Sequence, residues 1–148
     1  MKDIISYDQN YLPSQIEKDK ISKFLFKHLG AYGDPLADIE KAMDYALSTK
    51  QEPGGFITVV SKNDEVVCAV VVNKTGMAGY IPENILVYIA THEKQRGQGI
   101  GKRAMQHVIE KAEGDIALHV EPENPAKGLY ESLGFTNKYL EMRLKKGG

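Results

Sequence analysis

The stretch from residue 85 to residue 120 constrains the fold more than any other part of the sequence. Residues 85–90 are continuously apolar, which is typical of a central strand covered on both faces. Residues 99–112 repeat apolar side chains at helical spacing and carry charged side chains on the opposite face. A β-rich run, residues 116–120, follows, and this strand–helix–strand order predicts a right-handed crossover with parallel pairing. The helical face expected to be buried comprises Ile100, Ala104, Met105, Val108, Ile109 and Ala112.

Two helices are expected before this unit. The first follows Ser14 and keeps apolar residues at helical spacing until Gly30. The second is expected to begin with Asp34 as N-cap and Pro35 as the first helical residue. A short side-chain oxygen can accept a hydrogen bond from a free N–H group of the first turn, and proline lacks the N–H that the first helical position would leave unpaired.

The remaining runs complete a mixed sheet. Residues 56–60 and 66–72 flank the turn residues 62–65 and are predicted to form a hairpin. A short helix is expected from Asn124 and Pro125 onward, and residues 135–144 are expected to form a closing strand. The predicted order is β-α-α-β-β-β-α-β-α-β. This is an α/β (α+β) fold with a single mixed, largely antiparallel sheet, a central parallel strand pair and helices on both faces.

Composition narrows the class of protein. A length of 148 residues suits one domain, so residues 1–148 are expected to fold together. The net charge of −1 argues against a nucleic-acid partner, and the longest apolar run is too short to cross a bilayer. Cys68 lies in an apolar run and is expected to be a buried, inert thiol. The four histidines are far apart in the sequence and suggest no metal site. We expect a cytoplasmic protein with no membrane partner.

The junction between the apolar strand and the amphipathic helix carries the chemistry. Three alternating glycines allow positive φ angles and a close approach of the backbone to a ligand. The N–H groups of the turn and of the helix N-terminus can converge on an anion, and flanking cations add charge. Two familiar phosphate-binding motifs are excluded. Lys102 occupies the position of the third glycine of a dinucleotide-binding fingerprint, and Arg103 occupies the serine or threonine position of a P-loop. The predicted phosphate-binding residues are Arg96, Gly97, Gln98, Gly99, Ile100, Gly101 and Lys102.

This junction resembles the signature of the Gcn5-related N-acetyltransferase family, Arg/Gln-x-x-Gly-x-Gly/Ala, through Arg96, Gly99 and Gly101. Residues 124–126, followed by residues 129–135, resemble a second sequence element of the same family. The resemblance implies an acyl-CoA N-acyltransferase fold. It also implies acetyl-CoA as co-substrate, no metal, and direct acetyl transfer to a primary amine in a ternary complex. We expect the acceptor to be a small molecule.

The resemblance also implies roles for single residues. The pantetheine arm of acetyl-CoA would lie along the backbone of Ile89, Ala90 and Thr91, like an added strand. Asn124 would contribute to cofactor binding, although it stands six residues before Tyr130, where the family commonly has seven.

Two residues are candidates for acid–base catalysis. Tyr130 would be the general acid, because a phenol can protonate the leaving CoA thiolate. The alternative is that Tyr130 only packs against its neighbours. Glu83 matches the position of the base glutamate in the histone-acetylating branch of the family. A base is required because a primary amine is protonated at neutral pH. The alternatives for Glu83 are a solvent-facing residue or a ligand of the amine.

The acceptor site is less constrained. Tyr32, Tyr80 and Glu83 are candidate walls, and His119 is a candidate lining residue. Two other functions stay open, a non-catalytic acyl-CoA-binding sensor and a protein-lysine or N-terminal acetyltransferase. The sequence also leaves open a homodimer.

Overall fold

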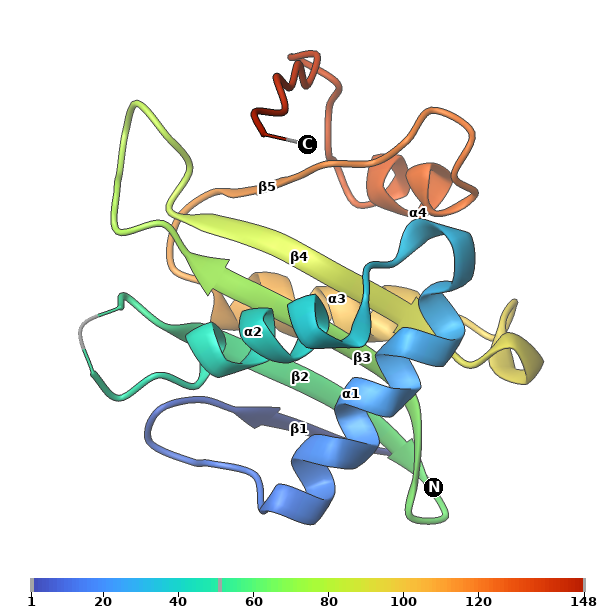
Figure 1. The fold of residues 1–148 in the computed structure, drawn as a ribbon. Helices are drawn as coiled ribbons and strands as arrows, with labels where there is room; N and C mark the ends of the chain where they lie inside the picture. Colours follow the sequence, from blue (N-terminus) through green and yellow to red (C-terminus); the bar gives the residue numbers. More distant parts are fainter. Residues whose placement is uncertain (1, 51, 148) are drawn as a thin grey trace. The chain divides into compact units, whose positions relative to one another are not determined.

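The computed structural model describes residues 2–50 and 52–147. In this part of the chain, five strands form one sheet in the order β1-β2-β3-β4-β5 (Figure 1). Neighbouring strands are antiparallel except for β4 and β5, which are parallel. The predicted mixed sheet is confirmed, although the parallel pair stands at one edge of the five strands and not at the centre. The strands are β1 Lys2–Tyr7, β2 Gly55–Lys62, β3 Glu65–Lys74, β4 Asn84–Thr91 and β5 Ile116–Leu118.

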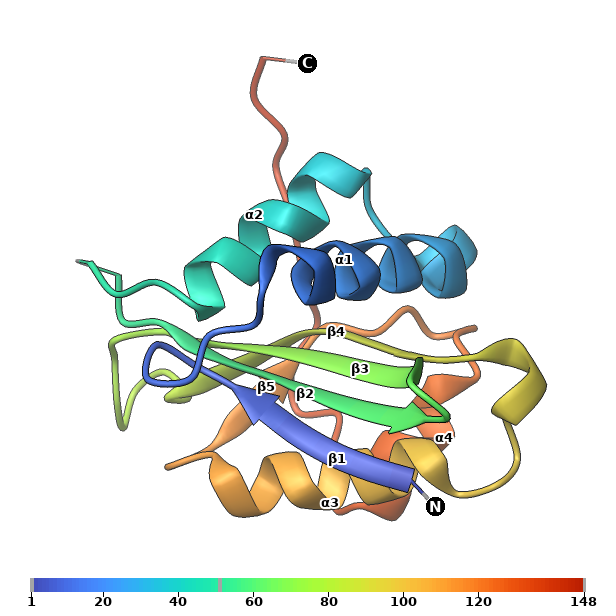
Figure 2. The ribbon, with the colours of Figure 1, turned by 90° about the horizontal axis from the view of Figure 1, so that it is seen from below.

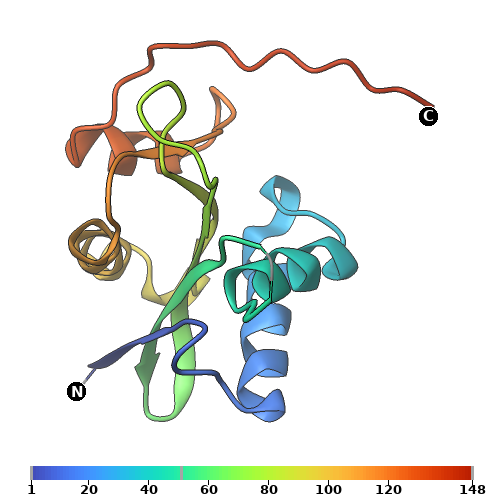
Figure 3. The same cartoon turned by 90° about the vertical axis from the view of Figure 1, so that its left-hand side faces the viewer.

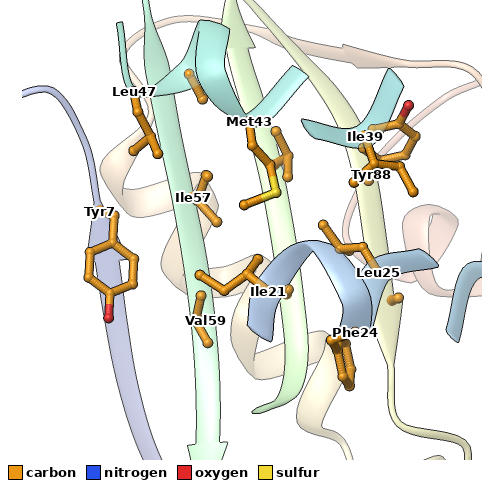
Figure 4. Packing of buried hydrophobic residues seen from close by; sticks show 14 residues of the cluster. Tyr7, Ile21, Phe24, Leu25, Ile39, Met43, Leu47, Ile57, Val59 and Tyr88 are labelled. Atoms are coloured by element: carbon orange, nitrogen blue, oxygen red, sulfur yellow. The ribbon is translucent and has the colours of Figure 1, made fainter. Parts of the chain in front are cut away.

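Helices cover both faces of this sheet, as predicted. α1 (Gln15–Leu29) and α2 (Leu36–Ala46) lie on one face, and α3 (Ile100–Lys111) lies on the other (Figure 2). A cluster of buried hydrophobic side chains lies between the α1–α2 pair and strands β1, β2, β3 and β4 (Figure 4). Leu25 and Met43 are fully buried in it. None of the helices in the described chain has both the length and the apolarity needed to cross a bilayer.

Local sequence explains how α1 begins, whereas a contact with a distant strand accompanies the departure of α2 from the prediction. Ser14 and Glu17 form a capping box, in which each side chain accepts a hydrogen bond from the other residue's backbone N–H. Asp34 was expected to cap α2, but Pro35 is the N-cap and no side chain caps the helix. The Asp34 carboxylate instead accepts a hydrogen bond of 2.5 Å from the Tyr88 hydroxyl in β4.

The hairpin of β2 and β3 is confirmed. Asn63 and Asp64 connect the strands with φ angles of 52° and 64°. Two consecutive left-handed residues are typical of a type I′ turn, whose twist matches that of the flanking strands.

Two predictions about burial are wrong. Residues 85–90 were expected to be covered on both faces, but burial alternates along β4, and Ile85 is 37% exposed. Alternating burial is typical of a strand with one well-covered face. Ile109 was placed on the buried face of α3 but is 41% exposed, because it lies beside the stripe formed by Ala104, Met105 and Val108.

The contacts divide the chain into one unit that reaches Leu118 and a second that begins at His119. The second unit contains α4 (Ala126–Ser132), which ends where Gly134 takes a φ of 100°. Residues 135–147 have no regular secondary structure (Figure 3), so the closing strand predicted for 135–144 is wrong. A strand needs a hydrogen-bonded neighbour, and no strand pairs with this segment in the described chain.

Candidate functional site

The glycine turn between β4 and α3 presents open backbone. It follows the short 3-10 helix η2 (Glu93–Gln95), and Gly97 and Gly99 take φ angles of 82° and 77°, which favour glycine. No heavy atom lies within 4 Å of where a Cβ on either glycine would stand. The turn is therefore built of glycine for its backbone conformation and is open on its outer side.

The N-terminus of α3 adds unpaired donors to this turn. Gly99 is the N-cap, and no side chain caps the helix. The Arg103 N–H donates to Gly99 O at 3.0 Å, so the N–H groups of residues 100–102 precede the first intrahelical bond. Lys102 is exposed beside them. These donors and the helix dipole favour an anion at this position, as expected from the glycine pattern.

Arg96 supports the turn from behind. Its Nη2 donates to the backbone oxygen of His28 at 3.3 Å, and its Nε lies 3.4 Å from Thr91 O. The guanidinium thereby joins the end of α1 to the end of β4. Arg96 was predicted to bind phosphate, and these contacts give it a positioning role as well.

Two histidines that are far apart in the sequence meet behind the turn. The ring centroids of His28 and His92 lie 4.3 Å apart, and the ring of Phe24 is tilted against that of His28 with centroids 4.6 Å apart. Burial, followed by the nearby His92 and Lys27, lowers the pKa of His28. His92 Nδ1 accepts a hydrogen bond from Lys94 N at 3.1 Å, which caps η2. Sequence reasoning missed this pair, although His28 follows Phe24 by one helical turn on the apolar face of α1.

Within the first unit, one edge of β4 has no paired strand near the glycine turn, and we call this the open edge. The pairing of β4 with β5 ends at Leu86, and no strand continues it within the first unit. His92 N donates to Val67 O of β3 at 2.8 Å, so residues 90 and 92 direct their backbone groups toward β3. Ile89 and Thr91 then direct theirs to the open edge. Among the three predicted pantetheine-binding residues, Ala90 therefore uses its backbone groups within the sheet. Only Ile89 and Thr91 present theirs for pairing with a ligand.

Glu83 lies at the opposite end of β4. Its Oε1 accepts a hydrogen bond from Asp115 N at 3.1 Å, and its side chain packs on Gly114, where any Cβ would overlap it. Eight strand residues separate Glu83 from the start of the turn, which is about 26 Å of extended chain. The structure does not bring Glu83 to the glycine turn.

The other predicted residues of the site lie in the second unit. Tyr130 is 7% exposed in α4, with its ring centroid 5.9 Å from that of Phe135. Asn124 Oδ1 accepts a hydrogen bond of 2.9 Å from the N–H group of Ala126, the first residue of α4. His119 is exposed, 4.0 Å from the Glu141 carboxylate.

The proposed acceptor walls lie in two separate loops. Tyr32 follows α1 and is 41% exposed, and Tyr80 lies between β3 and β4 and is 79% exposed. Among the described residues, no cluster of three or more histidine, cysteine or acidic side chains could hold a metal ion.

Comparison with known proteins identifies the family. The sequence profile of the acetyltransferase (GNAT) family matches residues 22–135, which include the glycine turn and Tyr130. The chain belongs to this family. The match also covers residues of both units of this GNAT protein, and it extends from α1 to Phe135.

Solved structures show the same fold. The ribosomal-protein-S18-alanine N-acetyltransferase of Escherichia coli is 17% identical, with a TM-score of 0.69 over 94% of this chain and 80% of that chain. Aminoglycoside N-acetyltransferase AAC(6′)-Iy, solved in complex with CoA, is 15% identical, with a TM-score of 0.69 over 99% and 95%. A GNAT protein of Streptococcus pneumoniae is 17% identical, with a TM-score of 0.70 over 99% and 98%. A search of curated proteins found no match.

Proposed function

We propose that this GNAT protein transfers the acetyl group of acetyl-CoA directly to a primary amine of a small molecule. The observation that carries the proposal is the glycine turn, because its open backbone and the uncapped N-terminus of α3 lie beside the open edge of β4. A pyrophosphate next to two amide groups in an extended arm is the part of CoA that matches this arrangement. The CoA complex of the aminoglycoside N-acetyltransferase supports the choice of donor.

The donor is held by backbone groups in this proposal. The pyrophosphate accepts hydrogen bonds from N–H groups of residues 98–102, where the helix dipole also favours negative charge. The two amides of the pantetheine arm extend along Ile89 and Thr91, whose backbone groups face the open edge. Arg96 and Asn124 act mainly as positioning residues, since Arg96 joins α1 to β4 and Asn124 bonds to the first N–H group of α4.

The transfer itself needs one acid and one base. The amine nitrogen attacks the thioester carbon, the carbon–sulfur bond breaks, and the CoA thiolate takes a proton from the Tyr130 hydroxyl. Glu83 accepts the proton of the amine in this proposal. Its Oε2 is the atom for that step, because Oε1 already accepts from Asp115 N. A route through ordered water would be needed to connect it with the amine.

We also infer that residues 1–148 act as a single acetyltransferase domain, because the family match runs through both units. Two other functions compete with the proposal. A non-catalytic acyl-CoA-binding sensor would need the glycine turn but neither Tyr130 nor Glu83. A protein-modifying acetyltransferase is suggested by the similarity to the enzyme named for ribosomal protein S18, while the complex of AAC(6′)-Iy with an acetylneamine bisubstrate analogue favours a small-molecule amine.

The direct test measures thiol release from acetyl-CoA with purified protein and separate panels of small amines, polyamines, amino acids and peptides. We expect turnover with at least one small amine and saturation in both substrates. CoA binding by calorimetry without turnover on any panel would favour the sensor. Turnover only with peptides would favour the protein-modifying enzyme.

A further inference from the structure

One carboxylate beside β4 is held in place without a cationic partner. Asp34 is exposed in the loop between the short 3-10 helix η1 (Gly30–Tyr32) and α2, and its Oδ2 accepts a hydrogen bond of 2.5 Å from the Tyr88 hydroxyl. No ion pair among the described residues involves Asp34. Because a bond from a neutral phenol leaves the negative charge in place, the carboxylate can still bind a cation through Oδ1.

Tyr88 fixes the position of this carboxylate. The side chain of Tyr88 is 8% exposed and lies beside Ile39 in the buried cluster between the sheet and the α1–α2 pair (Figure 4). Burial, followed by the hydrogen bond to Asp34, raises the pKa of Tyr88. The phenol therefore stays protonated as the donor, and the carboxylate stays the acceptor, at neutral pH.

The bond between Asp34 and Tyr88 does not serve helix α2. Aspartate is a favoured N-cap residue, but Pro35 holds that position and no side chain caps the helix. Departures from such local rules of stability concentrate at functional sites. The placement of Asp34 therefore points to a role outside its own helix.

Tyr88 also places Asp34 beside the reacting end of acetyl-CoA. In the proposed function, the pyrophosphate binds at the glycine turn, and the pantetheine arm passes Thr91 and then Ile89 along the open edge. The thioester then lies beyond Ile89, next to Tyr88 along the strand. The pairing of β4 with β3 skips Val87 at this point, and such bulges are frequent next to active sites.

A carboxylate at this place does not suit the amine that reacts. A negative charge close to an ammonium ion favours its protonated form, and a protonated amine cannot attack the thioester. The carboxylate suits instead a second cationic group of the acceptor, which keeps its charge during the reaction. Tyr32, two residues before Asp34, is 41% exposed and has an aromatic ring of the kind that binds cations.

We propose that Asp34, positioned by Tyr88, binds a second cationic group of the acceptor, so that the acceptor is a diamine or a polyamine. The proposal rests on the proposed function and names the substrate class of the same site. Asp34 determines specificity and takes no proton in the reaction, so Glu83 keeps its proposed role as the base.

Three acceptors with the same number of carbon atoms separate charge from shape. At the end opposite the reacting amine, cadaverine carries an ammonium group, pentylamine a methyl group and δ-aminovalerate a carboxylate. In the thiol-release assay at pH 7, kcat/KM of the wild-type protein should fall in that order. Asp34→Asn keeps the size and can still accept a hydrogen bond from Tyr88. It should lower the preference for cadaverine over pentylamine about tenfold and weaken the discrimination against δ-aminovalerate.

Two further variants control for the general field and for the fold. Asp38 lies in the first turn of α2, and its charge also acts on Tyr88. Asp38→Asn removes a nearby charge but leaves the bond between Asp34 and Tyr88, so it should change the preference less than about twofold. Tyr88→Phe keeps the buried ring and removes the support of the carboxylate, so the preference should fall in the same direction by a smaller factor.

Several outcomes would overturn the proposal and leave the transferase function intact. One is a wild-type protein that shows no preference for cadaverine over pentylamine. Another is a loss of kcat/KM in Asp34→Asn that is equal for all three acceptors, because a purely structural bond would act in that way. A change of the preference in Asp38→Asn as large as that in Asp34→Asn would assign the effect to the general field.

A binding measurement separates this proposal from the proposed function. Cadaverine is titrated calorimetrically into the wild-type protein and into Asp34→Asn, both in the presence of CoA. Binding that is about tenfold weaker in the variant would support the cation site even if no amine is acetylated, and only the transferase function would then fail. Equal binding to both proteins, or no binding to either, would overturn the cation site.

Discussion

The substitution Gly99→Asp tests the glycine turn with the fewest assumptions. Gly99 has a φ of 77°, and a Cβ added there meets no heavy atom within 4 Å, so the added side chain enters the open space above the turn. A carboxylate about 5 Å from one phosphate charge costs about 3 kcal/mol at an effective dielectric constant of about 20. The Kd of CoA should therefore rise about 100-fold.

Two control variants separate charge from backbone strain. Gly79 has a φ of 80° and equally open surroundings, but it lies between β3 and β4, away from the turn. Gly79→Asp should carry the same left-handed backbone cost and leave the Kd of CoA unchanged. Gly99→Asn keeps the size and the tolerance of positive φ without the charge, so it should weaken binding far less than Gly99→Asp.

Calorimetric titration with CoA measures all three variants, with circular dichroism and thermal unfolding as checks of the fold. A Kd for Gly99→Asp within about twofold of that for Gly79→Asp would refute the assignment of the turn to the pyrophosphate. The pyrophosphate of CoA would then have to bind elsewhere, and the proposed function would lose its main support, the glycine turn.

Three further predictions concern single side chains. Tyr130→Phe should lower kcat about 10²–10⁴-fold in the thiol-release assay while leaving the Kd of CoA unchanged, and wild-type turnover would return Tyr130 to a packing role. Glu83→Gln can still accept a hydrogen bond from Asp115 N, so the variant should lose no stability. Because the amide cannot act as a base, kcat should fall at pH 7 and partly recover at high pH. A change in the KM of the amine alone would make Glu83 a ligand. Because burial lowers the pKa of His28, the unfolded chain binds more protons below about pH 6.5, and stability should fall with falling pH. Urea unfolding at several pH values should show a smaller loss for His28→Gln, and an equal loss would assign the effect to other groups.

Local patterns predicted most elements because local physics decides them. The Ser14–Glu17 capping box and the left-handed Asn63–Asp64 pair act over a few residues, and so do the glycines of the turn. The parallel pairing of β4 with β5 across α3 was predictable as well, since it follows from the strand–helix–strand order of the hydrophobic pattern.

The predictions that failed depended on partners far away in the sequence. Asp34 has the residue type of an N-cap, but a tyrosine 54 positions further on takes its carboxylate. Nothing in the sequence indicated that the rings of His28 and His92 would meet, which they do because α1 packs on the end of β4. Residues 135–144 have the pattern of a strand, but pattern does not supply a neighbour with which to pair.

For this protein, the sequence by itself determined the family, the glycine turn and the types of chemistry that the turn can support. These depend on residue type and on spacing over a few positions. Only the tertiary structure decided that Arg96 joins α1 to β4, that Glu83 bonds to Asp115, and that the pairing of β4 with β5 ends at Leu86. Each of these is a meeting of groups brought together by packing. The free energy of such hydrogen bonds and strand pairings depends on distances between groups that are far apart in the sequence, and local sequence patterns do not specify these distances.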